Sequence, residues 1–355
     1  ANTYTGGTVI NQGTVNLISP STDIGSLVAS NVVIPAGGVT LNSGTLTMLT
    51  GQGQINPANT VTLNGTSALN LTGNNTLSAL VYNNNGGTSQ AVTTGGILTL
   101  TSATPVTVTS DNVATLPTLA GTVNLGSGTK TFNIGAIAPY GAAASILSPS
   151  LNVSGVLIGS AGLTKTGAGV LQLSGQNVFT GGVNLTAGGL ILGSSTNPVP
   201  AGNSPFSGPL GSGTLIAADG TWLVATGTQT VQNPVNFSAF TGAIPFYNLT
   251  NAAVTLNLNG PITVPSGAVS VNVLHPSLIV TLGSLTNAAS VTSITKNGLG
   301  TLNLGLDGYS GSLTFNDNIN TTAGTSNFGL LMDGNGSGVA DTLSYTGSLA
   351  FNGLA

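Results

Sequence analysis

One unit recurs along this chain, and it constrains the fold more than any other feature. Residues 163–193 contain its fullest copy, in which the motif Lys-x-Gly-x-Gly-x-Leu-x-Leu precedes a second pair of short alternating runs. Residues 2–17 repeat the second half of that copy without a gap, and residues 296–315 repeat the motif and part of the second half. A unit too short to bury a core alone folds by stacking on its neighbours.

Short stretches that alternate an apolar with a small polar residue extend from end to end, for example at 38–48, 105–109 and 254–259. This period of two predicts half-buried strands, and glycine, asparagine, proline and serine separate them. Many short strands fit either a sandwich or barrel or a β-solenoid. The self-similar unit favours the solenoid, with about 20–25 residues per coil and strands about 4.8 Å apart. Threonine, serine and asparagine would then face outward in hydrogen-bonded ladders.

The composition excludes several classes of partner. Charged residues make up 3% of the 355 positions, with no arginine and no glutamate, and the cations are Lys130, Lys165 and Lys296. Three lysines cannot neutralise a run of phosphates, so nucleic acid is excluded, as is a basic membrane-binding face. No window reaches about 18 consecutive apolar residues, so no transmembrane segment is expected.

Cysteine is absent, so disulfides and thiolate metal sites are excluded. A long β-array gains its stability from stacking and does not need such links, so export remains compatible with this composition. The first residues lack a charged segment followed by an apolar core, and we therefore expect that any signal peptide has been removed. These observations predict an extracellular or cell-surface protein.

We expect residues 1–355 to form a single β-solenoid array. A weak division is predicted near 138–150, where a segment rich in proline and alanine interrupts the alternation. A second interruption, at 197–209, contains four prolines. Both are interpreted as loop excursions from one array rather than as linkers between domains.

The repeated residues resemble the passenger-associated transport repeat of autotransporter passengers, also called the autotransporter-associated β-strand repeat. Residues 163–193 contain nearly the whole pattern, with Phe179 at the position that the family gives to tyrosine. Residues 2–17 and 296–315 contain parts of it, the latter with Asp307 in place of the usual asparagine. The resemblance implies an all-β fold, a right-handed parallel β-helix that is exported and displayed outside the cell.

Both ends of the sequence stop within the repeat pattern, whereas stacked repeats normally end in atypical polar caps. The last seven residues followed by the first seven read as close to one whole repeat. We therefore expect copies to join head to tail as a homopolymer, in a contact that does not close and so produces a filament. A fragment of a longer passenger would have the same ends. The residues predicted to form this contact are Asn2, Tyr4, Val9, Ile10, Leu349, Phe351 and Leu354.

Catalysis is not predicted. The only histidine, His275, precedes a proline and is interpreted as a turn residue, and no Gly-x-Ser-x-Gly motif is present. A carboxylate pair for glycoside hydrolysis would have to come from seven scattered aspartates, of which Asp307 and Asp317 lie nearest to predicted strands. An aspartate in a turn is the more common case.

One segment resembles a calcium loop. Asp333, Asn335 and Ser337 occupy its first, third and fifth positions, and Asp341 occupies its ninth. The twelfth position is Ser344 where a bidentate glutamate belongs, so a glycine- and asparagine-rich turn is the favoured interpretation. No cofactor other than this candidate calcium ion is expected.

The sequence thus predicts an exported structural protein, the subunit of an extracellular filament or sheath. The alternative is an adhesin passenger whose side binds a surface glycan or a host receptor. A polysaccharide-active β-helix enzyme is a third, less favoured class, because such enzymes need clustered acidic and basic residues.

Overall fold

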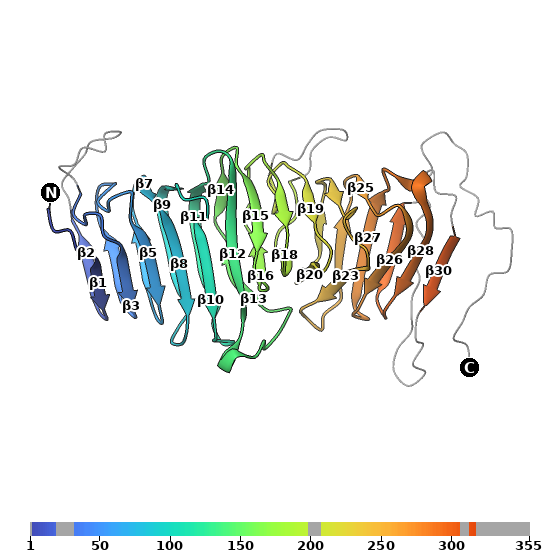
Figure 1. The fold of residues 1–355 in the computed structure, drawn as a ribbon, viewed down its shortest axis with the longest axis horizontal. Coiled ribbons are helices and arrows are strands. Elements are labelled where there is room, and N and C mark those ends of the chain that lie inside the picture. The colour runs from blue at the N-terminus through green and yellow to red at the C-terminus, as the bar shows by residue number, and fades with distance from the viewer. Residues whose placement is uncertain (1, 19–31, 198–206, 306–311, 317–355) are drawn as a thin grey trace.

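The computed structural model describes residues 2–18, 32–197 and 207–305, and the backbone of 312–316. These residues form a rod in which strands from successive turns of the chain lie side by side (Figure 1). Two long sheets and one short sheet contain the strands, and all pairs between the named strands are parallel. Each strand lies next to the strand one turn later, which is the topology of a parallel β-helix.

Sheet A has 11 strands. In spatial order they are β1 (Thr8–Asn11), β3 (Val39–Asn42), β5 (Thr60–Asn64), β8 (Ala79–Asn84), β10 (Val106–Ser110), β12 (Thr129–Ile137), β15 (Gly162–Thr166), β17 (Val183–Leu185), β19 (Leu215–Ala217), β22 (Val235–Asn236) and β25 (Ile262–Thr263).

Sheet B has 15 strands. Its main path is β2 (Thr14–Leu17), β4 (Thr45–Met48), β6 (Ala68–Leu71), β9 (Ala91–Leu100), β11 (Thr118–Asn124), β13 (Pro149–Val153), β16 (Val170–Leu173), β18 (Gly189–Leu192), β20 (Trp222–Ala225), β23 (Ala243–Asn248), β26 (Gly267–Val273), β28 (Val291–Asn297) and β30 (Ser312–Asn316). Beside it, β7 (Asn75–Leu77) pairs with β9, and β14 (Val156–Ile158) pairs with β11.

The short sheet has 4 strands: β21 (Gln229–Val231), β24 (Val254–Leu258), β27 (Leu278–Ser284) and β29 (Thr301–Gly305). Two 3-10 turns, η2 (Pro139–Gly141) and η3 (Ala288–Ser290), are the helical elements of the described residues. No helix among those residues has the length and hydropathy needed to cross a membrane.

The apolar residue of each alternating run faces inward. In β3 and β5, Leu41 lies next to Leu63 and both are fully buried, while the intervening Thr40 and Thr62 face outward. The same arrangement continues from coil to coil, so the inward side chains form one contiguous core from Ile10 to Leu304. The alternation therefore predicted the buried face correctly, and the all-β parallel β-helix is confirmed.

An asparagine ladder extends along the outside of sheet A. The Nδ2 of Asn42 donates to Oδ1 of Asn11 at 2.7 Å, Asn64 donates to Asn42 at 2.7 Å, and Asn83 donates to Asn64 at 2.7 Å. Thr109 then donates its hydroxyl to Oδ1 of Asn83 at 2.8 Å. These residues are in strict register, so each amide repeats its bond on the next coil and the predicted polar ladder is confirmed.

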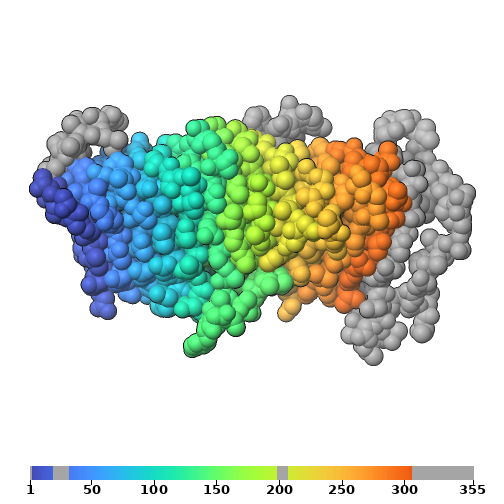
Figure 2. Space-filling view, in the orientation of Figure 1, coloured from blue at the N-terminus to red at the C-terminus, as the bar shows by residue number. Residues whose placement is uncertain are grey.

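The segment between β12 and β13 leaves the stack and protrudes from one side of the rod (Figure 2). The sheets continue past it, because β12 pairs with β15 and β13 pairs with β16. The interruption predicted near 138–150 is therefore a loop in the described structure. Whether residues 1–355 form a single array remains a prediction.

Candidate functional site

All three lysines of the chain lie inside the rod. Lys165, on β15, is fully buried, and its ammonium group donates to the carbonyl oxygens of Gly167 at 2.6 Å, Gly169 at 2.5 Å and Ala187 at 2.8 Å. The first two carbonyls belong to the turn that follows β15, and the third belongs to the next coil. The carbonyl of Gly169 also accepts the backbone N–H of Gly189 at 3.2 Å, whereas for the carbonyls of Gly167 and Ala187 the lysine is the hydrogen-bond donor found among the described residues.

Lys296 occupies the same motif position in the repeat at 296–315 and donates to the carbonyl of Gly298, two residues on, as Lys165 does to Gly167. Lys130 donates to the carbonyls of Thr101 at 3.0 Å and Ser102 at 2.9 Å and is also buried. Since the sequence contains no arginine, neither lysine nor arginine lies on the described exterior of the rod, where His275 is the one part-exposed basic side chain.

The two glycines of the Lys-x-Gly-x-Gly motif have separate roles. Gly167 has a φ of 78°, a left-handed conformation that favours glycine. At Gly169 a Cβ atom would lie 2.0 Å from the carbonyl oxygen of Gly135 on the preceding coil, so no side chain fits. The motif therefore forms a tight turn, and the lysine donates hydrogen bonds to the inward carbonyl oxygens of that turn.

Burial changes the acid–base behaviour of Lys165. Loss of solvent lowers the pKa of its amine to about 7. The three carbonyls oppose that effect, because a neutral amine has only two hydrogens to donate. The amine of the folded chain therefore loses its proton near neutral pH, well below the pH at which an exposed lysine does.

The first repeat lies at one end of both long sheets, where, among the described strands, β1 pairs only with β3 and β2 pairs only with β4. Residues 177–192 are the same repeat inside the stack. There Asn177 is buried, accepts a hydrogen bond from the backbone N–H of Leu157 on the preceding coil at 2.8 Å, and donates to the carbonyl of Pro209 at 2.8 Å. Its equivalent Asn2 is exposed and donates at 2.7 Å to the carbonyl of Val33.

The apolar positions differ in the same way. Phe179 and Leu190 are fully buried inside the stack, whereas their equivalents Tyr4 and Val15 are 43% and 39% exposed. Val15 aligns with the buried Leu46 of β4, so it faces the core and is uncovered only on the side where a preceding coil would lie.

The residues predicted for assembly are placed as follows. Asn2, Tyr4 and Val9 lie exposed at this edge, and Val9 occupies an outward position beside Thr40. Ile10 aligns with Leu41 and is buried in the core. The remaining predicted residues, Leu349, Phe351 and Leu354, lie outside the described residues, so the head-to-tail contact stays a prediction.

The candidate calcium ligands Asp333, Asn335, Ser337 and Asp341 also lie outside the described residues, as do Asp307 and Asp317. Within the described part of the chain, no three histidine, cysteine, aspartate or glutamate side chains are close enough together to hold a metal ion. His275 is in the turn between β26 and β27, where its Nδ1 accepts the backbone N–H of Ser277 at 3.1 Å. That contact agrees with a turn histidine.

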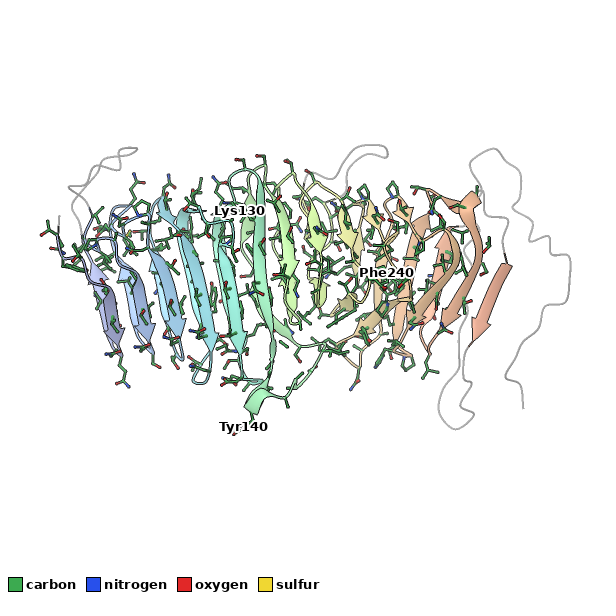
Figure 3. All side chains as sticks on the ribbon, in the orientation of Figure 1. Lys130, Tyr140 and Phe240 are labelled. Atoms are coloured by element: carbon green, nitrogen blue, oxygen red, sulfur yellow. The ribbon has the colours of Figure 1, made fainter. Side chains whose placement is uncertain are left out.

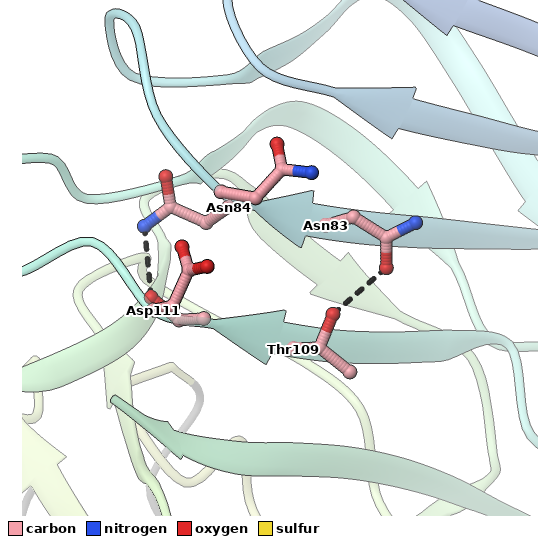
Figure 4. Close-up of a pocket in the computed structure, with 6 residues that line it drawn as sticks. Asn83, Asn84, Thr109 and Asp111 are labelled. Carbon is pink, nitrogen blue, oxygen red and sulfur yellow. Dashed lines mark hydrogen bonds between the residues drawn. The ribbon is translucent and has the colours of Figure 1, made fainter. Parts of the chain in front are cut away.

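A pocket that sequence reasoning missed is located at the carboxyl ends of β8 and β10. It has a volume of about 290 Å³ (Figure 4). Its lining residues are Asn83, Asn84, Asn85, Thr109, Ser110 and Asp111. The run of three asparagines was the only available signal, and it resembles the other asparagine-rich turns of the chain.

Comparison with known proteins supports the repeat. A model of the passenger-associated-transport-repeat family matches residues 1–17 and 163–192. Those residues are the edge repeat of β1 and β2 and the interior repeat of β15 to β18. The chain therefore carries passenger-associated transport repeats, as its sequence indicated.

The chain is also similar to an adhesin autotransporter, BmaC, of Brucella suis biovar 1 (strain 1330), with 35% identity over 113 residues. The aligned part is 31% of this chain and 3% of the relative, so the chain spans a small fraction of that protein. No solved structure matches the chain. Together the two matches place the chain outside the cell or at its surface, as predicted.

Replacing Lys165 should destabilise the rod more than replacing Lys130. Lys165→Met leaves the carbonyls of Gly167 and Ala187 without a donor, since that of Gly169 keeps the N–H of Gly189, and should lower the free energy of unfolding by about 2–4 kcal/mol. Lys130→Met also frees two carbonyls, but Lys130 is 8% exposed and Lys165 is 0% exposed, so water can reach the Lys130 site more easily and the loss should be about half as large. Urea unfolding followed by circular dichroism measures both. Equal losses in the two variants would contradict the role assigned to Lys165.

The stability of the rod should also depend on pH through Lys165. Its pKa is near 10.5 in the unfolded chain and about 7 in the folded chain, so the unfolded chain binds more protons between these values. The free energy of unfolding should therefore rise with pH from about 7 to about 10, by at most about 1.4 kcal/mol per unit. Lys165→Met should lose this slope, whereas Lys130→Met should keep it. Parallel pH profiles for the native chain and Lys165→Met would disprove the assignment.

Proposed function

We propose that this chain is a structural rod of an exported protein and that its copies stack end to end through the edge formed by β1 and β2. The observation that carries the proposal is the difference between two copies of one repeat. Inside the stack, Asn177, Phe179 and Leu190 are covered by the coils on both sides. At the edge, the equivalent residues are covered on one side only.

A further coil placed on this edge would supply what the interior repeat receives. A backbone N–H could reach Oδ1 of Asn2, as that of Leu157 reaches Asn177. Apolar side chains would cover Tyr4 and Val15, and the free sides of β1 and β2 would find strand partners. The asparagine ladder could also be extended by the added coil. Asn11 accepts from Asn42 through its Oδ1, so its Nδ2 could donate to a coil placed against β1 on the side away from β3.

Stacking of this kind joins unlike ends of two copies, so it is a heterologous contact. Because the joined copies share one axis, the contact does not close into a ring and extends as a filament. A surface with little net charge favours such association, since repulsion between copies is weak.

A charge placed on the edge should block stacking. Val15→Lys puts an ammonium group where a second coil would bury it, and filaments visible by negative-stain electron microscopy should disappear. Val113→Lys is the matched control, because it adds the same charge at an exposed site on the side of the rod. Filaments of Val15→Lys that match those of Val113→Lys, or a native chain without filaments, would reject end-to-end stacking.

Adhesion is a second candidate function, and the chemistry of the exterior favours it. All cations are buried, and the outward rows consist largely of threonine and asparagine, so the side of the rod offers hydrogen bonds without positive charge. A neutral glycan or protein surface fits such a face better than an anionic polymer. The likeness to an adhesin supports the same role.

The adhesion hypothesis predicts saturable binding of the fluorescently tagged chain to cultured epithelial cells. Binding should change less than about twofold between about 0.05 and about 0.5 M NaCl, and heparin should not compete, because no lysine or arginine of the described residues faces outward. Flow cytometry with the tag alone as control measures both effects. Loss of binding in heparin or at high salt would contradict a neutral contact, and linear uptake without saturation would contradict specific adhesion.

A further inference from the structure

The loop that protrudes between β12 and β13 is internally ordered. The N–H of Gly141 donates to the carbonyl of Ala138 at 3.0 Å, and the N–H of Ala144 donates to the carbonyl of Ile137 at 2.9 Å, which closes the base of the loop. Tyr140 lies within η2 at a φ of 54°, a conformation uncommon for residues other than glycine and asparagine. Two backbone hydrogen bonds and a tight turn therefore define the shape of the loop.

The outer face of sheet B is apolar where the loop covers it. Val170, Ile191 and Val224, on β16, β18 and β20, face outward and are almost completely buried, and Leu147 of the loop belongs to the same apolar cluster. Many other outward positions of this sheet carry polar side chains, as Asn70 does on β6, although Ile97 on β9 is an apolar exception. The rod thus has an apolar patch on sheet B against which the base of the loop packs.

Trp222, the only tryptophan of the chain, completes this anchor. Its Nε1–H donates to the carbonyl of Ile146 at 2.8 Å, across 76 positions of sequence. A Cβ atom at Gly189 would lie 2.3 Å from the indole nitrogen, so the missing side chain at this position makes room for the ring. Packing and a hydrogen bond therefore fix the loop to the side of the rod.

The tip of the loop exposes an aromatic ring. Tyr140 is fully exposed and points away from the rod (Figure 3), and its hydroxyl has no hydrogen-bond partner among the described residues. It is the most exposed of the large apolar side chains in the described residues. A rigidly presented tyrosine loses little conformational freedom on binding and offers both an apolar ring and a hydroxyl.

The pocket at the carboxyl ends of β8 and β10 lies on the same lateral side of the rod as the loop. The N–H of Ala138, where the loop begins, donates at 2.8 Å to the carbonyl of Ser110, which lines the pocket. Asn84 is fixed there, because its side chain donates to Oγ of Ser110 at 3.0 Å and accepts from Oγ1 of Thr115 at 2.7 Å. The pocket is therefore preformed.

One group in the pocket has no partner. The Asp111 side chain is exposed, and its carboxylate accepts no hydrogen bond from the described residues. The three lysines are buried and the chain has no arginine, so neither side chain can pair with it in a second copy. A neutral donor can, and the phenol of Tyr140 is one that is fully exposed and has no hydrogen-bond partner among the described residues.

We propose that two copies of this chain associate side by side, with Tyr140 of each copy inserted into the Asn83–Asp111 pocket of the other. The tip and the pocket lie on one lateral side of the rod. A two-fold axis between antiparallel rods therefore brings the Tyr140 of each copy to the pocket of the other copy at once. The ring lies against asparagine amides, and the phenol O–H donates to the Asp111 carboxylate. This lateral contact is independent of end-to-end stacking and uses different residues.

The contact is tested in chains that carry Val15→Lys, so that end-to-end stacking does not contribute. Sedimentation velocity should show a monomer–dimer equilibrium for this chain. Tyr140→Asn keeps the left-handed turn, because asparagine tolerates a positive φ, and should weaken the dimer at least about tenfold. Asp111→Asn should weaken it as well. Ile216→Ala, at an exposed outward position of β19, should leave the dimer unchanged.

Photocrosslinking locates the contact. With p-benzoyl-phenylalanine in place of Tyr140, the ring is retained, and irradiation should yield a product of twice the chain mass. Mass spectrometry of that product should map the link to residues 83–85 or 109–111. A monomer at every concentration would overturn the proposal. So would a dimer insensitive to Tyr140→Asn, or crosslinks that map elsewhere on the chain.

Discussion

Hydrogen bonding between identical positions of successive coils is the constraint on which this structure depends. Each parallel strand pairs in register with the strand one turn earlier and one turn later, as Leu41 does with Ile10 and Leu63. A stack of this kind requires an inward residue that is apolar at every turn and an outward residue that tolerates its own kind above and below. The core from Ile10 to Leu304 and the asparagine ladder are the two outcomes of that requirement.

The same constraint explains where the few charges are. A coil that turns between two sheets leaves carbonyls pointing inward, most of them without a strand partner, and an inward lysine is a long donor that reaches several of them. Lys165 reaches three and Lys130 reaches two. Because the three lysines donate to interior carbonyls, none of them lies on the described exterior. That exterior can bind a partner mainly through neutral hydrogen-bonding groups, apolar contacts and carboxylates.

Sequence reasoning predicted the features that repeat. The period of two identified Leu171 and Leu173 as inward residues, and the recurrence of Lys-x-Gly-x-Gly identified the coil that begins at Lys165. It did not predict that Lys165 is buried, since a lone lysine normally reads as a solvated residue. Sequence reasoning also missed the apolar patch under the loop. Ile191 and Val224 are brought together by strand register, and Leu147 reaches them from a distant part of the sequence.

This difference has a physical basis that also bears on function. Residues that repeat serve the stack, and they make every coil of the side nearly equivalent, so a ligand would find no preferred position among them. Specific recognition on such a rod requires a departure from the repeat. The loop that ends in Tyr140 and the pocket beside Asp111 are two such departures, and both lie on one side of the rod. A rod of this kind would recognise its partners at these irregular places.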